Sequence, residues 1–349
     1  MKQVHGGEIF RYRGCLDFST NLNPVGIPDS VKKAAAESIA HLTEYPEPGS
    51  ESLCKAIAEA EGIPWEQVIC GNGAAELIFS VVRTLKPKEA LVQAPSFSEY
   101  EQALCSESCR IRRNYLKEDR NFVTEWDFPD QITKKTDLVF LCSPNNPTGI
   151  PMKKELLTKV LEKCRDTKTF LFLDECFVDF VSDPENLTMT GYLKDFPNLF
   201  ILKAFTKRFG MAGLRLGYGM CGDRGFLKRM RSGMQPWNVS VPAQAAGTAA
   251  LKETGFIEKG REIVAVERPF LVRILTEAGF RVFPSQANYL LFKGREDLFE
   301  RMLEHGILIR DCCNYPGLTR GYFRIAVKTH DENIRFQDAL KQIMTKRST

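Results

Sequence analysis

A lysine, an acid and an amide each follow a run of apolar residues, and together they could do chemistry on an amine. Asn146 lies in the string Ser-Pro-Asn-Asn-Pro-Thr-Gly of residues 143–149, Asp174 follows the apolar residues 169–173, and Lys207 follows the apolar residues 199–202. Pyridoxal phosphate needs such a set, because a lysine forms a Schiff base with it, an acid keeps its ring nitrogen protonated, and an amide reaches its phenolic oxygen. The pattern therefore predicts a pyridoxal phosphate site, with Arg215 as a further candidate.

Each of these groups also has an ordinary structural interpretation. A lysine beside a glycine-rich turn is usually solvated, a string of Asn, Pro and Gly usually forms a turn, and an aspartate after a strand usually caps a helix. Motifs of this kind have many false positives when they are taken singly. The order of the groups favours the cofactor site, because the whole string followed by Asp174, Lys207 and Arg215 is hard to reach by accident.

The segments between these groups predict an α/β fold. Residues 90–93, 138–142, 169–173 and 199–202 are apolar at consecutive positions, which is typical of strands buried on both faces. Residues 154–164 have an apolar stripe at helical spacing. Strands that alternate with helices indicate a mostly parallel sheet, whose ligands gather at the carboxyl ends of the strands. Pro95, Asn146, Asp174 and Lys207 all fall at such ends.

A second region with a different pattern begins near Ile257. A long helical pattern runs to about Ala278, with a kink expected at Pro269. Strands are expected at residues 289–292 and 322–327, with helices at about 297–305 and after Asp331. This mixture predicts a smaller α+β domain.

Composition excludes several classes of function. The net charge of the 349 residues is +4 (48 − 44), and the positive charge is not concentrated, so nucleic acid is not an expected partner. Eleven cysteines without C-x-x-C spacing, and no signal peptide at the start, indicate reduced thiols in a soluble cytoplasmic protein. No apolar run approaches the ~18 residues of a membrane helix, and the four histidines are too scattered to predict a metal site.

The chain resembles the fold-type I aminotransferase superfamily, in the branch that holds histidinol-phosphate aminotransferase and threonine-phosphate decarboxylase. The resemblance runs from His-Gly-Gly at 5–7 to Tyr-Phe-Arg-Ile at 322–325. Residues 5–7, 16–24, 174–180, 234–237 and 307–318 favour the decarboxylase. The resemblance implies a fold-type I PLP-dependent transferase: a large PLP-binding domain (29–256) with a mostly parallel sheet, a small α+β domain (257–349) and an N-terminal arm (1–28) packed with the small domain.

The resemblance also implies which residues bind pyridoxal 5′-phosphate. Backbone amides after the glycines of residues 71–73 lie at a helix start, where phosphate binds. Phe97 is expected to stack on the pyridine ring, Asp174 to pair with its nitrogen and Asn146 to contact its phenolic oxygen. The implied phosphate ligands are Ala74, Ala75, Thr206, Lys207 and Arg215, together with Tyr45, which is expected to reach across a homodimer interface into the partner's site.

Further residues are implied to hold the substrate. Arg324 is expected to grip an α-carboxylate in a bidentate pair, and Arg310 to bind a substrate phosphate or carboxylate. His5, Gly6 and Asn21 of the arm, together with Asn146, are expected to touch the substrate. Phe177 stands where aminotransferases of the family commonly have a tyrosine, which favours a reaction other than transamination.

The implied reaction is decarboxylation of L-threonine O-3-phosphate to (R)-1-amino-2-propanol O-2-phosphate for cobalamin biosynthesis. The alternative is transamination of histidinol phosphate with 2-oxoglutarate. The choice is geometric, because the Cα bond that stands perpendicular to the cofactor ring is the one that breaks. A pyridoxal-binding regulator fused to a DNA-reading module is disfavoured, because residues 17–24 already belong to the enzyme pattern.

Overall fold

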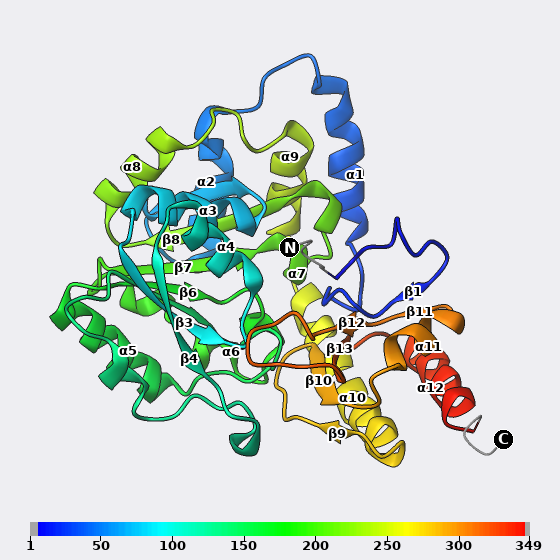
Figure 1. Ribbon diagram of the computed structural model, residues 1–349. Helices are drawn as coiled ribbons and strands as arrows, with labels where there is room; N and C mark the ends of the chain where they lie inside the picture. The colour runs from blue at the N-terminus through cyan, green and yellow to red at the C-terminus, as the bar shows by residue number, and fades with distance from the viewer. Residues whose placement is uncertain (1–5, 346–349) are drawn as a thin grey trace.

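The structure, a computed structural model, describes residues 6–345 (Figure 1). His5 therefore lies outside the described residues. Within them, a seven-stranded sheet has the order β2-β8-β7-β6-β5-β3-β4. Strand β8 is antiparallel to both of its neighbours and the other pairs are parallel, which confirms the predicted mostly parallel sheet. The strands are β2 (Val68–Asn72), β3 (Glu89–Ala94), β4 (Arg110–Tyr115), β5 (Leu138–Cys142), β6 (Phe170–Asp174), β7 (Leu199–Ala204) and β8 (Leu216–Cys221).

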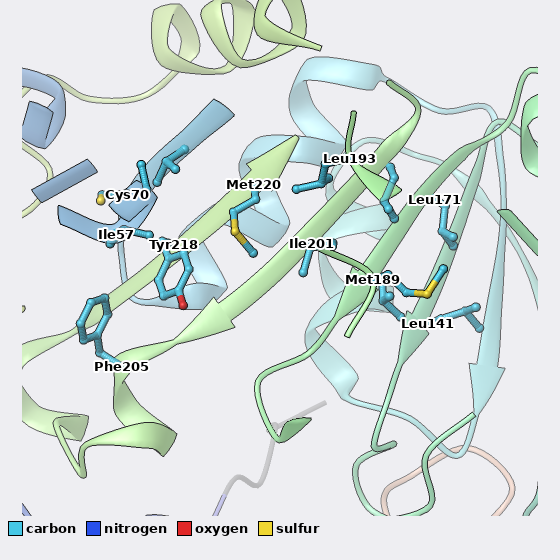
Figure 2. Close-up of a cluster of buried hydrophobic side chains, with 14 of the residues drawn as sticks. Ile57, Cys70, Leu141, Leu171, Met189, Leu193, Ile201, Phe205, Tyr218 and Met220 are labelled. Carbon is cyan, nitrogen blue, oxygen red and sulfur yellow. The ribbon is translucent and has the colours of Figure 1, made fainter. Parts of the chain in front are cut away.

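The central strands β5, β6 and β7 are apolar except at Asp174 and Lys203, because helices cover both faces of the sheet. On one face the rings of Phe140, Phe172 and Phe200 follow one another, with centroids 4.7 and 5.2 Å apart. The opposite face carries aliphatic side chains such as Leu171 and Ile201 in a second buried cluster, part of which is seen in Figure 2. The two faces thus have separate cores that fix the strand ends in space.

The helices of this sheet form a layer on each face (Figure 1). The face with the aliphatic cluster is covered by α1 (Asp29–Glu37), α2 (Glu51–Glu61), α5 (Lys154–Thr167) and α9 (Val241–Ala250). The face with the phenylalanines is covered by α3 (Ala74–Leu85), α4 (Ser98–Ser106) and α8 (Arg224–Gly233). The short helices α6 (Pro184–Leu187) and α7 (Phe205–Arg208) follow strands β6 and β7.

A second, smaller sheet has the order β12-β13-β10-β9 and packs against helices α10, α11 and α12. The long helix α10 includes Pro269 without ending there. Residues of the arm lie beside this unit, where strand β1 pairs in parallel with β11. The elements are β1 (Leu16–Asp17), α10 (Phe256–Glu277), β9 (Arg281–Val282), β10 (Tyr289–Lys293), α11 (Leu298–Glu304), β11 (Ile307–Leu308), β12 (Arg310–Asp311), β13 (Tyr322–Ala326) and α12 (His330–Thr345).

The segment that follows β4 joins the two sheets. Glu118 accepts a hydrogen bond from the hydroxyl of Tyr322 and pairs with Arg281 at 2.9 Å and Lys293 at 3.4 Å. Next to it, Phe122 packs in an apolar cluster with residues of the smaller sheet. These contacts join β9, the end of β10 and the start of β13 to the segment that follows β4.

Candidate active site

Asn146, Asp174 and Lys207 come together at the edge of the large sheet where the parallel strands end. Cys142, Asp174 and Leu202 are Cα partners across β5, β6 and β7, so the loops that carry Asn146 and Lys207 start at the same level as Asp174. They line a cavity of about 240 Å³ that also receives side chains of the arm and of the smaller sheet. The predicted residues in its lining are Gly6, Asn21, Ala74, Ala75, Phe97, Asn146, Asp174, Thr206, Lys207, Arg215, Arg310 and Arg324.

Lys207 has an unusually acidic ammonium group. Desolvation, followed by repulsion from Arg324 and Arg215, lowers its pKa to about 8, while Asp174 opposes this change. Its Nζ lies 5.7 Å from the centroid of the Phe177 ring. A neutral amine is the form that attacks a carbonyl, so this lysine is prepared to form a Schiff base near neutral pH.

Asp174 is buried at the end of β6. Its Oδ1 accepts the backbone N–H of Cys176 at 2.9 Å, and its Oδ2 accepts the hydroxyl of Tyr100 at 2.6 Å. Burial raises the pKa of Asp174. Hydrogen bonds from the Cys176 thiol, the Tyr100 hydroxyl and the Cys176 N–H, and the charge of Lys207, act in the opposite direction by stabilising the carboxylate. A buried carboxylate of this kind suits a partner that is itself a cation.

The start of helix α3 forms an anion cradle with Arg215. Gly73 at the N-cap has φ +82° and supplies no side-chain cap, so amides of the first turn face the cavity at Ala74 and Ala75. A Cβ on Gly73 would come within 2.6 Å of Nη2 of Arg215, which shows how closely the guanidinium approaches this turn. Backbone amides and a fixed cation at one point match a phosphate group.

Arg324 is buried and held from two directions. Its Nη1 donates to Oδ1 of Asn146 and its Nη2 donates to the carbonyl of Ser19 at 2.8 Å. With its amide oxygen turned to the guanidinium, Asn21 accepts from Nη1 and Nε at 3.3 Å. Arg324 therefore joins the arm, the loop after β5 and the strand β13 at one position in the cavity.

Arg310 lies beside Arg324, because their Cα atoms are partners across β12 and β13. Its Nη1 donates to the carbonyl of Asp311 at 2.6 Å, and its Nη2 donates to Oδ1 of Asn314 at 2.8 Å. Its buried Nε has no hydrogen-bond partner among the described residues. Since a buried N–H without a partner is costly, the cavity has an unused donor next to a second arginine.

Two predicted residues need separate mention. Tyr45 does not line this cavity; it is 79% exposed, and its ring lies 4.6 Å from that of Trp237. Gly6 lines the cavity where the arm turns over Ser19, whose hydroxyl accepts the N–H of Gly7 at 2.7 Å. A Cβ on Gly6 would overlap the carbonyl of Ser19, so a glycine suits this position.

Sequence reasoning missed several residues that line the cavity or support its side chains. Ser19 contributes through its backbone carbonyl, which no side-chain pattern reveals. Tyr100 lies one helical turn after Phe97, so the spacing could have placed both on one side of α4, but nothing in the motif indicates a contact with Asp174. Cys142 and Cys176 also line the cavity, and burial raises the pKa of both thiols, so they are neutral there.

A wider hollow of about 720 Å³ lies elsewhere, lined by Trp126, Met152 and Asn186 among others. It contains none of the predicted site residues. The smaller cavity is the candidate active site because it holds the lysine, the buried acid and the three arginines.

Comparison with known proteins decides the family. The model of the family "Aminotransferase class I and II" matches residues 13–340. The chain belongs to this family. Over 334 residues it is 36% identical to the threonine-phosphate decarboxylase of Salmonella typhimurium, covering 95% of this chain and 91% of that protein.

Two solved structures extend this finding. The histidinol-phosphate aminotransferase from Clostridium acetobutylicum has a TM-score of 0.89 and 32% identity, covering 95% of this chain and 99% of that chain. The L-threonine-O-3-phosphate decarboxylase from Porphyromonas gingivalis has a TM-score of 0.84 and 26% identity, covering 94% and 99%. The predicted fold-type I architecture and the predicted resemblance are thereby confirmed.

The aminotransferase class I and II family uses pyridoxal 5′-phosphate, so the predicted cofactor is confirmed and the protein is a PLP-dependent enzyme. The cavity fits pyridoxal phosphate, because a lysine with a lowered pKa, a buried carboxylate and the anion cradle line the same space. Over residues 6–345 no helix has the length and apolar composition of a membrane span, and no cluster of metal-ligating side chains is found.

Proposed function

We propose that this enzyme decarboxylates L-threonine O-3-phosphate to (R)-1-amino-2-propanol O-2-phosphate, a reaction of cobalamin biosynthesis. The observation that carries the proposal is the pair of buried arginines on β12 and β13, in addition to Arg215 at the anion cradle. Three cations match three anions: the cofactor phosphate at Arg215, the substrate carboxylate at Arg324 and the substrate phosphate at Arg310.

The size of the cavity also supports a compact substrate. Its volume of about 240 Å³ lies below the ~300–1,000 Å³ of typical ligand pockets, although it has to receive cofactor and substrate. Threonine phosphate has no ring to accommodate. Phe177 further supports decarboxylation, because its ring offers no hydroxyl and packs edge-on to Tyr289 at 4.8 Å.

In this proposal three residues would hold the cofactor ring: Asp174 at its nitrogen, Phe97 on its face and Asn146 at its phenolic oxygen. When bound, pyridoxal phosphate serves as an electron sink for the charge that develops at the substrate Cα. Arg324 would hold the substrate carboxylate and Arg310 the other end of the substrate, so the two arginines would decide which bond of Cα is aligned for cleavage.

Lys207 has a second role after CO2 leaves. Its Nζ, or a water beside it, donates a proton to Cα, which its lowered pKa of about 8 favours near neutral pH. The arm residues Gly6 and Asn21, together with His5, cover the substrate in this proposal and keep water from the site.

Transamination of histidinol phosphate remains the second candidate. It is favoured by the similarity to the histidinol-phosphate aminotransferase from Clostridium acetobutylicum. Two arginines can also hold the two carboxylates of 2-oxoglutarate, so the arginine pair alone does not separate the two reactions. The reaction assay has to include both substrates.

We further propose a cytoplasmic homodimer. The eleven cysteines are all free thiols, which fits a reducing compartment. The exposed pair of Tyr45 and Trp237 supports a dimer in which Tyr45 reaches the partner's cofactor phosphate.

The proposal is tested by measuring CO2 release from L-threonine O-3-phosphate, O-phospho-L-serine and L-threonine. We expect the two phosphorylated substrates to react, with the threonine derivative preferred by roughly tenfold for its extra methyl group. L-Threonine should be slower by roughly a hundredfold or more, because Arg310 would be left unpaired. Equal rates for threonine and its phosphate would contradict the role of Arg310.

A further inference from the structure

Tyr100 is a fully buried tyrosine that lies behind the proposed cofactor site. It lies in the first turn of helix α4, which begins directly after Phe97. Its hydroxyl donates to Oδ2 of Asp174 at 2.6 Å. Its ring stacks on Phe140, with centroids 4.9 Å apart and planes 11° apart, and meets Phe97 edge-on at 5.6 Å.

The contacts of Asp174 show why this hydroxyl matters. Burial favours the neutral acid, whereas a pyridinium partner requires the carboxylate. Oδ1 of Asp174 accepts the backbone N–H of Cys176 and Oδ2 accepts the hydroxyl of Tyr100. The thiol of Cys176 also stabilises the carboxylate by a hydrogen bond. The neighbouring thiols of Cys142 and Cys176 are neutral, because burial raises their pKa values. Tyr100 is the side chain whose hydroxyl donates to Oδ2 of Asp174.

Tyr100 itself stays protonated. Burial first, and then the charge of Asp174, raise its pKa well above the usual value of a phenol. It is therefore a permanent donor to Oδ2. Its stacking on Phe140 fixes the ring, so the hydroxyl has little freedom to turn away.

We propose that Tyr100 is a positioning residue that keeps Asp174 ionised and aimed, so that the proton between Asp174 and the cofactor lies on the ring nitrogen. Through its edge contact it also supports Phe97, the residue assigned to the ring face. One side chain thus stabilises two of the groups that hold the pyridine ring. The inference rests on the proposed place of Asp174 at the ring nitrogen and not on which reaction follows.

The test is the Tyr100→Phe variant loaded with pyridoxal phosphate labelled with ¹⁵N in the ring. The ¹⁵N chemical shift reports directly whether the ring nitrogen carries a proton. The substitution keeps the ring and its stacking but removes the donor, so we expect the proton equilibrium to move toward the carboxyl group by roughly tenfold to a hundredfold. The ¹⁵N resonance should shift toward that of neutral pyridine, and kcat should fall about tenfold or more with KM little changed.

Tyr289→Phe is the matched control. Tyr289 is equally buried, and its hydroxyl donates to the backbone carbonyl of Asn145 at 2.9 Å, so its removal deletes a buried phenol without touching Asp174. The ¹⁵N resonance of the cofactor ring in Tyr289→Phe should match that in the wild type. A protonated nitrogen in the wild type that stays equally protonated in Tyr100→Phe would overturn the inference. An unprotonated nitrogen in the wild type would instead overturn the pairing with Asp174 on which it rests.

Discussion

The pKa of Lys207 is set by its burial and by charges of both signs around it. Desolvation and the two arginines disfavour the ammonium form, and Asp174 favours it only in part. The folded-state pKa of about 8 is below the ordinary 10.5, so the amine gains its reactive neutral form as pH rises through about 8. Burial and the two arginines thus favour the reactive form of the lysine.

This balance predicts the pH dependence of cofactor attachment. The rate at which apoprotein and pyridoxal phosphate form the visible absorbance band should rise with pH and level off above about 8. Stopped-flow absorbance between pH 6 and pH 10 measures it. Lys207→Ala should give no such band at any pH; a variant that keeps the band would remove Lys207 from its role.

Arg324 is predicted to bind the substrate through its planar fork. Arg324→Lys keeps the charge but cannot make a bidentate pair, so KM should rise roughly tenfold to a hundredfold while the cofactor stays bound. Steady-state kinetics and the visible spectrum separate the two effects. Arg320→Lys, at an exposed position of the preceding loop, is the control and should leave KM unchanged. An unaltered KM in Arg324→Lys would make the carboxylate assignment wrong.

For single residues, the sequence predicted those site residues that belong to a short local motif. Asn146, Asp174, Lys207 and Arg215 could be predicted because short strings carry them at strand ends. The hydrogen bond between Tyr100 and Asp174 spans 74 residues of chain, and the neighbouring positions of Arg310 and Arg324 arise only from strand pairing. Such contacts depend on tertiary structure and leave no local pattern.

At the scale of elements, strand β8 passes close to the start of helix α3 at Gly217. A Cβ there would lie 2.5 Å from the backbone nitrogen of Ala74 and 2.8 Å from its Cα. A side chain would push the start of α3 away from Arg215. Because Gly217 has no side chain, the first amides of α3 can stay close to Arg215 in the anion cradle.

Gly217→Ala should weaken pyridoxal phosphate binding by roughly tenfold or more, because the amides of α3 lose their alignment with Arg215. The affinity is measured by titrating apoprotein and following absorbance. Gly191→Ala is the control, since a Cβ at Gly191 meets no atom within 4 Å. If both variants bind the cofactor like the wild type, the close approach has no part in phosphate binding.

Element prediction succeeded for strands made of consecutive apolar residues and failed where arginines or glycines interrupt the apolar run. Strands β5, β6 and β7 were predicted because both of their faces are covered by helices. Strand β4 escaped notice because it is an edge strand rich in arginine, whose side chains pair with acids such as Glu89 and Glu101. Strand β8 contains Gly217 and Gly219, which lower strand propensity but allow close packing.

For the whole molecule, we propose that the arm (1–28), the large domain (29–256) and the small domain (257–349) act together around one cavity. The arm supplies Gly6 and Asn21, the large sheet supplies Lys207, and the small sheet supplies Arg324. The site therefore exists only when all three parts are packed, which local sequence patterns could not reveal.

The proposed dimer is tested by mixing two inactive variants. Lys207→Ala lacks the reactive lysine, and Tyr45→Ala lacks the residue assigned to the partner's site. Hybrid dimers should regain one intact site, so the activity of the mixture should exceed the sum of the separate activities. Activity that stays at that sum after subunit exchange would mean that Tyr45 does not serve a partner's site.

The most direct test of the account offers the holoenzyme L-threonine O-3-phosphate, and in parallel histidinol phosphate with 2-oxoglutarate, and measures both CO2 and glutamate. We expect CO2 and 1-amino-2-propanol O-2-phosphate from the first substrate and little glutamate from the second. Glutamate formation without CO2 release would contradict it and would show that Arg310 and Arg324 orient substrates for transamination.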